Sequence, residues 1–440
     1  MKFRNFGRVS LALVASVVLA FGTQSCNYNY TAAYVIVLGS QYNQVASYKE
    51  NNDTGGLVAA PHDPQSSGGT NPVRAALLTG GRYVYVLNQG TPQVQSDGSI
   101  KWSGGGISIF SIGGDGALSY QLTYPSQGNG SKRLLFSLSS GYLYVLDQYQ
   151  PGASANQTTP ASPTQSAAFP CYDPTSKVYR PAGDITAFQV DASTGRLFLV
   201  QNQQQQNSQG TPLSYFPVGC GPIDFHLASN YIYTAETSDP ATGNQQVVYA
   251  YAASGTSGQL TQVPGGAQPI SGATNIGVIG GSSDGKWVYI LDNGTNQIFT
   301  FEPGSNGLLT ATSIPSIPNA STAAGMTALT TDSNSRYLYV TNTVSTGLNQ
   351  TSSQLSIFNI TAGSGVLTPA SQPTYGTGST PMCVFEDPSH QYIYTGNAGS
   401  SDMTGAHFDP NTGVLTNLPK GSTWKVIGTP TWCLYSSNTD

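Results

Sequence analysis

The chain has 440 residues, only 8% of them Asp, Glu, Lys or Arg, and its formal net charge at pH 7 is −5. A typical soluble protein contains about 25% charged residues. So few cations argue against nucleic-acid binding, because neutralising a phosphate backbone requires clustered Lys and Arg side chains. The lack of helical periodicity after the first 25 residues predicts an all-β protein that works outside the cytoplasm.

Residues 1–25 are expected to be a signal peptide. Lys2, Arg4 and Arg8 precede an apolar run of 13 residues, 9–21, which is too short to span a bilayer as a permanent helix. The segment resembles a bacterial lipoprotein signal, which implies lipidation at Cys26, although the motif usually has Leu at the position of Thr23. Ordinary signal-peptide cleavage is the alternative. Residues 27–33 would then form a short tether.

Residues 34–440 are predicted to form a single domain, because one unit recurs seven times. Each unit has a Tyr-rich strand such as Tyr83–Val86, a strand that ends in an aromatic residue such as Phe110, and a Gly-x-Leu turn. The turns begin at Gly55, Gly116, Gly195, Gly258, Gly307, Gly365 and Gly413. A period near 50 residues with about four β-runs per unit is typical of a β-propeller. We therefore predict seven blades of four antiparallel strands.

The two ends of the repeat array are expected to share a blade. The first unit begins at Tyr34 with its second strand, and no inner strand precedes it. Residues 431–436 read as an inner strand that follows the last turn, with no further strand after it. Pairing of 431–436 with 34–38 would close the ring and remove exposed sheet edges.

Long insertions are predicted to gather on one face of the disc. In an antiparallel blade, the connections between second and third strands and those between successive blades lie on the same face, which we call the loop-rich face. The insertions are 89–105, 148–183, 343–353 and the connection that contains Gln203–Gln206. Loops held on a rigid scaffold often carry function. The alternative is that these insertions are tolerated decoration.

The chain has five cysteines: Cys26, Cys171, Cys220, Cys383 and Cys433. If Cys26 carries lipid, four remain, which is the even number expected for disulfides in an oxidising compartment. Their places in the repeat favour Cys171–Cys220 and Cys383–Cys433. The second bridge would join neighbouring sheets and requires a Cα separation under about 7 Å. The cysteines and histidines lack the spacing of a metal site, so we expect no metal and no other cofactor.

The Tyr-rich strands and turns such as Asn411-Thr412-Gly413-Val414-Leu415 resemble the seven-bladed lactonase family, which includes 6-phosphogluconolactonase-type propellers, and the broader YVTN-type surface propellers. The resemblance covers residues 34–436. It implies a site on the loop-rich face, formed by a Gly-x-Gly-Pro-Arg-His run, an Asn-Glu pair and a Ser-Asn-Arg-Gly run. Here Gly219-Cys220-Gly221-Pro222 is retained, but Ile223-Asp224 replaces the Arg-His pair. Ala235-Glu236 keeps the acid.

The other positions of the resemblance are also altered. Asn293 lies in a run without the expected Arg, and Gln89 follows Asn88 where the family often has Glu. Lactone hydrolysis requires a base to activate water and donors to hold the oxyanion. Glu236, Asp224 and His226 are therefore candidate catalytic residues, and the candidate substrate-binding residues are Arg74, Arg133, Gln89 and Asn293. Structural roles compete with each assignment. Any ligand is expected at the axial mouth of the loop-rich face, near Arg74, Arg133, Asp224 and Glu236.

Two functions follow from these residues. The first is an exported, lipid-anchored propeller, in the periplasm or at the cell surface, that binds a surface glycan or protein. The second is a hydrolase of a small sugar lactone, with Glu236 as base, so the residues leave open whether the protein is an enzyme. A phosphorylated substrate is disfavoured, because the motif cations are lost. We expect a monomer that touches the membrane only through its lipid anchor and does not bind nucleic acid.

Overall fold

The computed structural model describes residues 30–80, 82–96, 100–139, 141–152, 171–173, 178–179, 182–239, 245–265, 267–321, 325–343 and 353–437. The expected signal peptide and Cys26 lie outside these residues, so both remain predictions. Within the described part, we find no helix with the length and apolar character that a membrane crossing requires.

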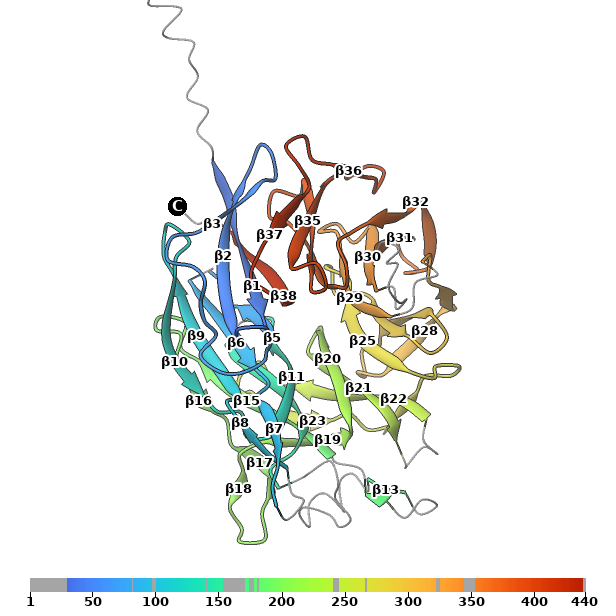
Figure 1. Cartoon of the computed structure of the whole chain (residues 1–440). Coiled ribbons are helices and arrows are strands. Elements are labelled where there is room, and N and C mark those ends of the chain that lie inside the picture. Colours follow the sequence, from blue (N-terminus) through green and yellow to red (C-terminus); the bar gives the residue numbers. More distant parts are fainter. Residues whose placement is uncertain are drawn as a thin grey trace, which may run out of the picture.

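Seven antiparallel sheets form a ring, which confirms the seven-bladed propeller (Figure 1). From the axis outward, the first four blades consist of the following strands. Blade 1 has β38 (Pro430–Ser437), β1 (Thr31–Gly39), β2 (Gln44–Asn51) and β3 (Leu57–Ala59), with β4 (Gln65–Ser66) also on β2. Blade 2 has β5 (Pro72–Leu77), β6 (Tyr83–Asn88), β9 (Gly106–Ile112) and β10 (Leu118–Tyr124). Blade 3 has β11 (Asn129–Phe136), β12 (Tyr142–Tyr149), β15 (Ala182–Val190) and β16 (Leu197–Leu199), with β19 (Phe216–Cys220) also on β15. Blade 4 has β20 (Pro222–Ala228), β21 (Tyr231–Asp239), β22 (Gln245–Ala253) and β23 (Leu260–Gln262), with β24 (Gln268–Pro269) also on β22.

The last three blades repeat the same order. Blade 5 has β25 (Ile276–Gly281), β26 (Val288–Asp292), β27 (Gln297–Pro303) and β28 (Leu309–Pro318). Blade 6 has β29 (Met326–Thr331), β30 (Tyr337–Asn342), β31 (Gln354–Ile360) and β32 (Leu367–Gly376). Blade 7 has β33 (Pro381–Glu386), β34 (Tyr392–Asn397), β35 (Asp402–Phe408) and β36 (Leu415–Asn417), with β37 (Thr423–Lys425) also on β35.

The ring closes as the sequence predicts. The C-terminal strand β38 pairs antiparallel with β1, and the register places Tyr34 opposite Ser436 and Leu38 opposite Trp432. Figure 1 shows the red β38 beside the blue β1. Because β1 begins at Thr31, the last residues of the expected tether belong to this sheet.

The sequence repeat encodes the packing between blades. The first aromatic residue of each second strand packs on the Gly of the Gly-x-Leu turn in the next blade. The pairs are Tyr34–Gly116, Tyr83–Gly195, Tyr142–Gly258, Tyr231–Gly307, Trp287–Gly365, Tyr337–Gly413 and Tyr392–Gly55. Each of these glycines has a positive φ, and an added Cβ would overlap the aromatic ring. Both the backbone conformation and the lack of space for a side chain therefore require glycine. The second Tyr of each Tyr-x-Tyr pair, such as Tyr85 or Tyr144, is fully buried.

Each inner strand carries a β-bulge near its start, where the pairing with the second strand slips by one residue. The bulge repeats in all seven blades, so the residues that follow it occupy equivalent places around the axis. These residues are Arg74, Arg133, Asp224, Val278, Ala328, Cys383 and Trp432. Three charged side chains from successive blades 2, 3 and 4 thus start at one level of the channel.

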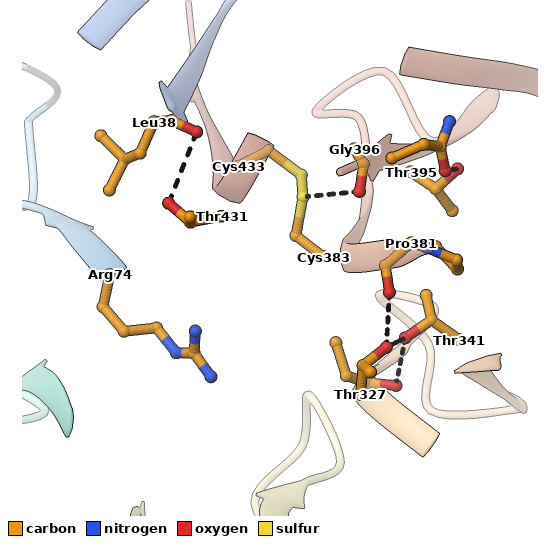
Figure 2. Close-up of a disulfide and its surroundings, with 12 residues drawn as sticks. Leu38, Arg74, Thr327, Thr341, Pro381, Cys383, Thr395, Gly396, Thr431 and Cys433 are labelled. Carbon is orange, nitrogen blue, oxygen red and sulfur yellow. Dashed lines mark hydrogen bonds between the residues drawn. A yellow bond between two sulfur atoms is a disulfide. The ribbon is translucent and has the colours of Figure 1, made fainter. Parts of the chain in front are cut away.

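Both expected disulfides are present. Cys171 bonds to Cys220 with a Cα separation of 5.6 Å. Cys383 in β33 bonds to Cys433 in the closing strand β38, with a Cα separation of 5.7 Å, well inside the geometric limit (Figure 2). The second bridge therefore fastens the closing strand of blade 1 to the inner strand of blade 7.

Short two-stranded ribbons extend from the blades within the predicted insertions. They are β7 (Thr91–Val94) with β8 (Ile100–Ser103), β13 (Tyr172–Asp173) with β14 (Val178–Tyr179), and β17 (Asn202–Gln206) with β18 (Pro212–Leu213). The β17–β18 ribbon lies along the outer strand of blade 4, where Gln204 Nε2 donates to Thr261 Oγ1 at 2.8 Å.

Candidate functional site

The inner strands of blades 3 and 4 are joined by an ion pair between Arg133 and Asp224. Arg133 NH1 lies 3.0 Å and 2.9 Å from the two carboxylate oxygens. Asp224 also accepts hydrogen bonds from the backbone N–H groups of Phe225 at 3.0 Å and Ile279 at 3.1 Å. Only 4% of the Asp224 side chain and 16% of the Arg133 side chain are exposed. Asp224 is therefore well neutralised where it lies.

Arg74 lies beside this pair and is held differently. Its guanidinium stacks over the Trp432 ring at 4.3 Å, and NH1 donates to the Val73 carbonyl at 2.9 Å. Its Nε is buried and has no hydrogen-bond partner among the described residues. Burial lowers the pKa of Arg74 to about 10, with the charge of Arg133 acting in the same direction and Asp224 opposing it. Arg74 and Arg133 line one small axial cavity of about 20 Å³.

His226 extends from β20 toward blade 5. Burial lowers its pKa to about 3, and the charge of Arg133 adds to the effect. A Cβ at Gly281 would overlap Nε2 of His226, so the imidazole packs directly on the backbone of β25. His226 is neutral at physiological pH, and this neutral, packed ring fits a structural role better than proton transfer.

Glu236 is held between β21 and Gly219, and none of it is exposed. Thr234 Oγ1 donates to its carboxylate at 3.1 Å, and a Cβ at Gly219 would overlap that carboxylate. The retained glycine of the 219–222 run therefore makes room for the retained acid. Glu236 pairs in register with Pro222, the residue before the bulge. The same register position holds Asn88, Asp147, Asp292, Asn342 and Asn397 in other blades, all fully buried.

Gln89 and Asn293 lie in connections between strands. Asn71 Nδ2 donates to Gln89 Oε1 at 2.8 Å. Asn293 bridges blades 5 and 6, because its Nδ2 donates to the Met326 carbonyl at 3.2 Å and its Oδ1 accepts from the Met326 N–H at 2.7 Å. The structure thus brings Arg74, Arg133 and Asp224 together at the axis and places Glu236, Gln89 and Asn293 elsewhere. The functional roles of all seven candidates remain predictions.

Blade 3 contains a buried carboxyl pair that was not predicted from the sequence. Asp147 and Asp184 are directly opposite each other on β12 and β15, and neither is exposed. Burial raises the pKa of Asp147 to about 6, and burial together with the charge of Asp147 raises that of Asp184 well above its ordinary value. Both carboxyls therefore hold a proton more readily than an ordinary Asp side chain does. The sequence did contain a signal for this pair, since Asp147 lies near the end of a Tyr-rich strand and Asp184 near the start of the strand after the insertion.

Three larger cavities of the described residues lie away from the axis. One of about 490 Å³ lies between blades 6 and 7, beside the connection 376–378 on the loop-rich face. Its polar lining includes the hydroxyls of Tyr375, Thr404 and Thr423 and the amide of Asn417. We call it the rim groove. The second, of about 200 Å³, lies where the β17–β18 ribbon meets blade 4. The third, of about 290 Å³, lies between blades 3 and 4 and is lined mainly by apolar atoms, including those of Leu138 and Leu227.

The fold is that of a seven-bladed β-propeller. Residues 305–433 match the family model described as lactonase, 7-bladed beta-propeller, which confirms the resemblance seen in the sequence. Comparison with curated proteins gave no match.

Solved structures share the fold over nearly the whole chain. A putative 6-phosphogluconolactonase from Bacteroides fragilis superposes with a TM-score of 0.64 at 16% identity, covering 93% of this chain and 99% of its own. The periplasmic gluconolactonase of Pseudomonas aeruginosa gives a TM-score of 0.65 at 15% identity, covering 92% and 99%. At these identities the likeness establishes the fold alone.

Proposed function

We propose that the protein is an exported propeller, anchored through lipidated Cys26, that binds a neutral surface glycan in the rim groove. The observation that carries this proposal is the contrast between its cavities. The axial cavity of about 20 Å³ has room for roughly one water-sized group. Pockets for small molecules measure about 300–1,000 Å³, and the rim groove, at about 490 Å³, falls in that range.

The chemistry of the rim groove suits sugar hydroxyls. Its hydroxyl and amide side chains both donate and accept hydrogen bonds, as sugar hydroxyls do. Tyr375 adds a ring face for apolar C–H groups, and its hydroxyl is oriented by a 2.7 Å hydrogen bond to Asn417 Oδ1. The lining carboxylate, Asp402, is already bound by Asn397 at 2.9 Å and Ser400 at 2.7 Å and paired with Lys425 at 3.6 Å. A neutral ligand therefore suits the groove better than a charged one.

Two disulfides support export, because such bonds persist mainly in oxidising compartments. Lipidation is tested by metabolic labelling with palmitate of the wild-type protein and of Cys26→Ala. The wild type should be labelled and sediment with membranes, whereas Cys26→Ala should be unlabelled. An unlabelled wild type would leave an exported protein without the anchor.

Glycan binding is tested with a glycan array followed by calorimetry on the oligosaccharides that bind. Tyr375→Ala and Asn417→Ala should each weaken binding about tenfold, the loss expected from roughly one charge-neutral hydrogen bond with its packing. Tyr120→Ala is the matched control, because Tyr120 is half exposed on an outer strand of blade 2. Equal affinity in Tyr375→Ala and Tyr120→Ala would exclude the rim groove.

The second candidate is a hydrolase of a small sugar lactone, with Glu236 as the base. The family match over residues 305–433 supports it. Because Glu236 is buried against Gly219, substrate access would require movement of the 219–222 segment. The test is to assay a panel of neutral lactones with the wild type and with Glu236→Gln. Hydrolysis by the wild type that is lost in Glu236→Gln at an unchanged Tm would favour catalysis. The absence of any turnover would exclude it.

A further inference from the structure

The axis carries more positive than negative charge. Arg74, Lys132 and Arg133 come from the inner strands of blades 2 and 3, and Asp224 from blade 4 is the carboxylate that faces them. Burial and the charge of Arg74 lower the pKa of Lys132. His226, which also lies beside Arg133, is neutral because its pKa is about 3. Among the residues that the structure describes, Arg74 and Lys132 thus have no paired carboxylate, in a chain whose net charge is −5.

Asp224 cannot neutralise Arg74 as well. Its two oxygens already accept from Arg133 and from two backbone N–H groups. Trp432 offers Arg74 a ring face, but an aromatic ring has no net charge, so the contact leaves the charge of the guanidinium uncompensated. The buried Nε of Arg74 has no protein partner in the described part of the chain. A buried donor on a charged group is costly unless something accepts its hydrogen bond.

The cavity beside Arg74 has the right size and walls for a small ion. It measures about 20 Å³ and is lined by Arg74 and Arg133 together with the apolar side chains of Val278, Ala328 and Leu329. Figure 2 shows the Arg74 guanidinium extending from β5 toward the middle of the view, on the side where Thr327 lies. Thr327 is another lining residue, and its hydroxyl donates to the Pro381 carbonyl and is hydrogen-bonded to the Thr341 hydroxyl.

We propose that this axial cavity binds one small monovalent anion, either a halide or the carboxylate of a molecule as small as formate, between Arg74 and Arg133. The anion accepts the hydrogen bond of Arg74 Nε and offsets the surplus charge at the axis. Because strands from blades 1, 2, 3, 5 and 6 line the cavity, the bound anion ties these blades together. Apolar walls favour weakly hydrated anions such as bromide over strongly hydrated ones such as sulfate. This site is independent of the glycan proposal.

The direct test is an anomalous difference map from crystals grown in sodium bromide. A bromide peak within hydrogen-bond distance of Arg74 Nε is expected, and its occupancy should fall when formate is added if carboxylates also bind. A map with no peak at Arg74 would overturn the proposal. This measurement uses the wild-type protein and does not depend on any variant being folded.

The solution test compares Tm across a titration of sodium bromide against sodium sulfate at constant ionic strength. Saturable bromide binding should raise Tm by about 1–2 °C at tenfold excess over Kd, whereas sulfate should give no saturable rise. Arg74→Gln should abolish the bromide response. Lys286→Gln is the control that removes the same charge, since Lys286 is 69% exposed and paired with Asp284. A bromide response that survives in Arg74→Gln, or an equal response to sulfate, would refute the site.

Discussion

Tyr394 and Glu50 are separated by 344 residues in the chain and meet at the seam between the last and first blades, with the hydroxyl 2.9 Å from the carboxyl. The same hydroxyl lies 2.7 Å from the Gly55 carbonyl. The single proton of the Tyr394 hydroxyl cannot serve both acceptors fully. A protonated Glu50 relieves this competition, because it donates its own proton to the Tyr394 hydroxyl, which then donates to the Gly55 carbonyl. Burial, with the charge of Asp387 in addition, raises the pKa of Glu50 to about 8.

This raised pKa predicts that stability falls as the solution becomes alkaline. The ordinary pKa of the group is 4.5, so the folded protein binds the proton more tightly than the unfolded chain between pH 4.5 and 8. The stabilisation is complete below pH 4.5 and is lost as pH rises through 8. Each pH unit in that window should lower the free energy of unfolding by up to about 1.4 kcal/mol. Urea denaturation at pH 5, 7 and 9 measures this slope.

Glu50→Gln should flatten the slope, because the amide cannot ionise. Asp147 and Asp184 also have raised pKa values and act in the same direction, so part of the decline should remain. The exposed Glu302→Gln is the control. A slope in Glu50→Gln equal to that of the wild type would show that the seam does not hold a protonated carboxyl.

The contact between the Tyr142 ring and the turn glycine of the next blade predicts that two glycines of one turn respond very differently to substitution. Gly258 has φ +67°, and a Cβ there would lie 2.5 Å from a ring carbon of Tyr142, whereas a Cβ at Gly255 would meet nothing within 4 Å. Gly258→Ala should therefore lower the free energy of unfolding by about 1–3 kcal/mol, through backbone strain and displacement of the Tyr142 ring. Gly255→Ala should change it by less than about 0.5 kcal/mol. Equal losses of unfolding free energy in the two variants would contradict a stabilising role for the Tyr142–Gly258 contact.

The architecture could be predicted from the sequence because its determinants repeat. The Tyr-x-Tyr strands and Gly-x-Leu turns are the two halves of one interblade contact, so seven copies indicate seven blades. The orphan strands at Tyr34 and at 431–436 indicated the closure for the same reason. Both disulfides followed from the positions of their cysteines in adjacent repeats.

The candidate site was only partly accessible to sequence reasoning. Arg74 and Arg133 were expected near the axis because they begin inner strands, and the repeated bulge does place them there. The burial of Glu236 depends on the close approach of Gly219, which is a long-range contact that no local pattern reports. A hint existed, since the ends of the other second strands carry Asn or Asp, which marks this register as a position for buried hydrogen-bonding side chains.

The closing disulfide predicts how the ring responds to reduction. Cys383 and Cys433 join β33 to β38 across 50 residues, a loop for which cross-linking contributes about 4 kcal/mol in the chain-entropy model. Cys433→Ser should lower the unfolding free energy by about 2–4 kcal/mol, and Cys383→Ser/Cys433→Ser should lose no more than the single variant. Denaturation with and without reductant measures both. Deletion of residues 430–440 should lower the unfolding free energy further, because β1 then loses its inner neighbour β38 and keeps only β2. A truncated protein with the Tm of the parent would rule out this role of β38.

The Arg133–Asp224 pair allows a binding or catalytic role to be separated from a structural one. Arg133→Gln leaves the Asp224 carboxylate buried with backbone donors alone, and should cost about 2–4 kcal/mol in the free energy of unfolding. Asp224→Asn leaves a further uncompensated cation at the axis and should cost a similar amount. The double variant removes both charges, so its loss should be smaller than the sum by at least about 1 kcal/mol. Thermal unfolding of the four proteins gives this coupling energy.

Anion binding, glycan binding and lactone turnover should be followed in the same four proteins. A structural pair predicts that glycan affinity at the rim groove and any turnover stay unchanged once the variants are folded. Lost turnover in the double variant at a nearly restored Tm would instead place the reaction at the axis.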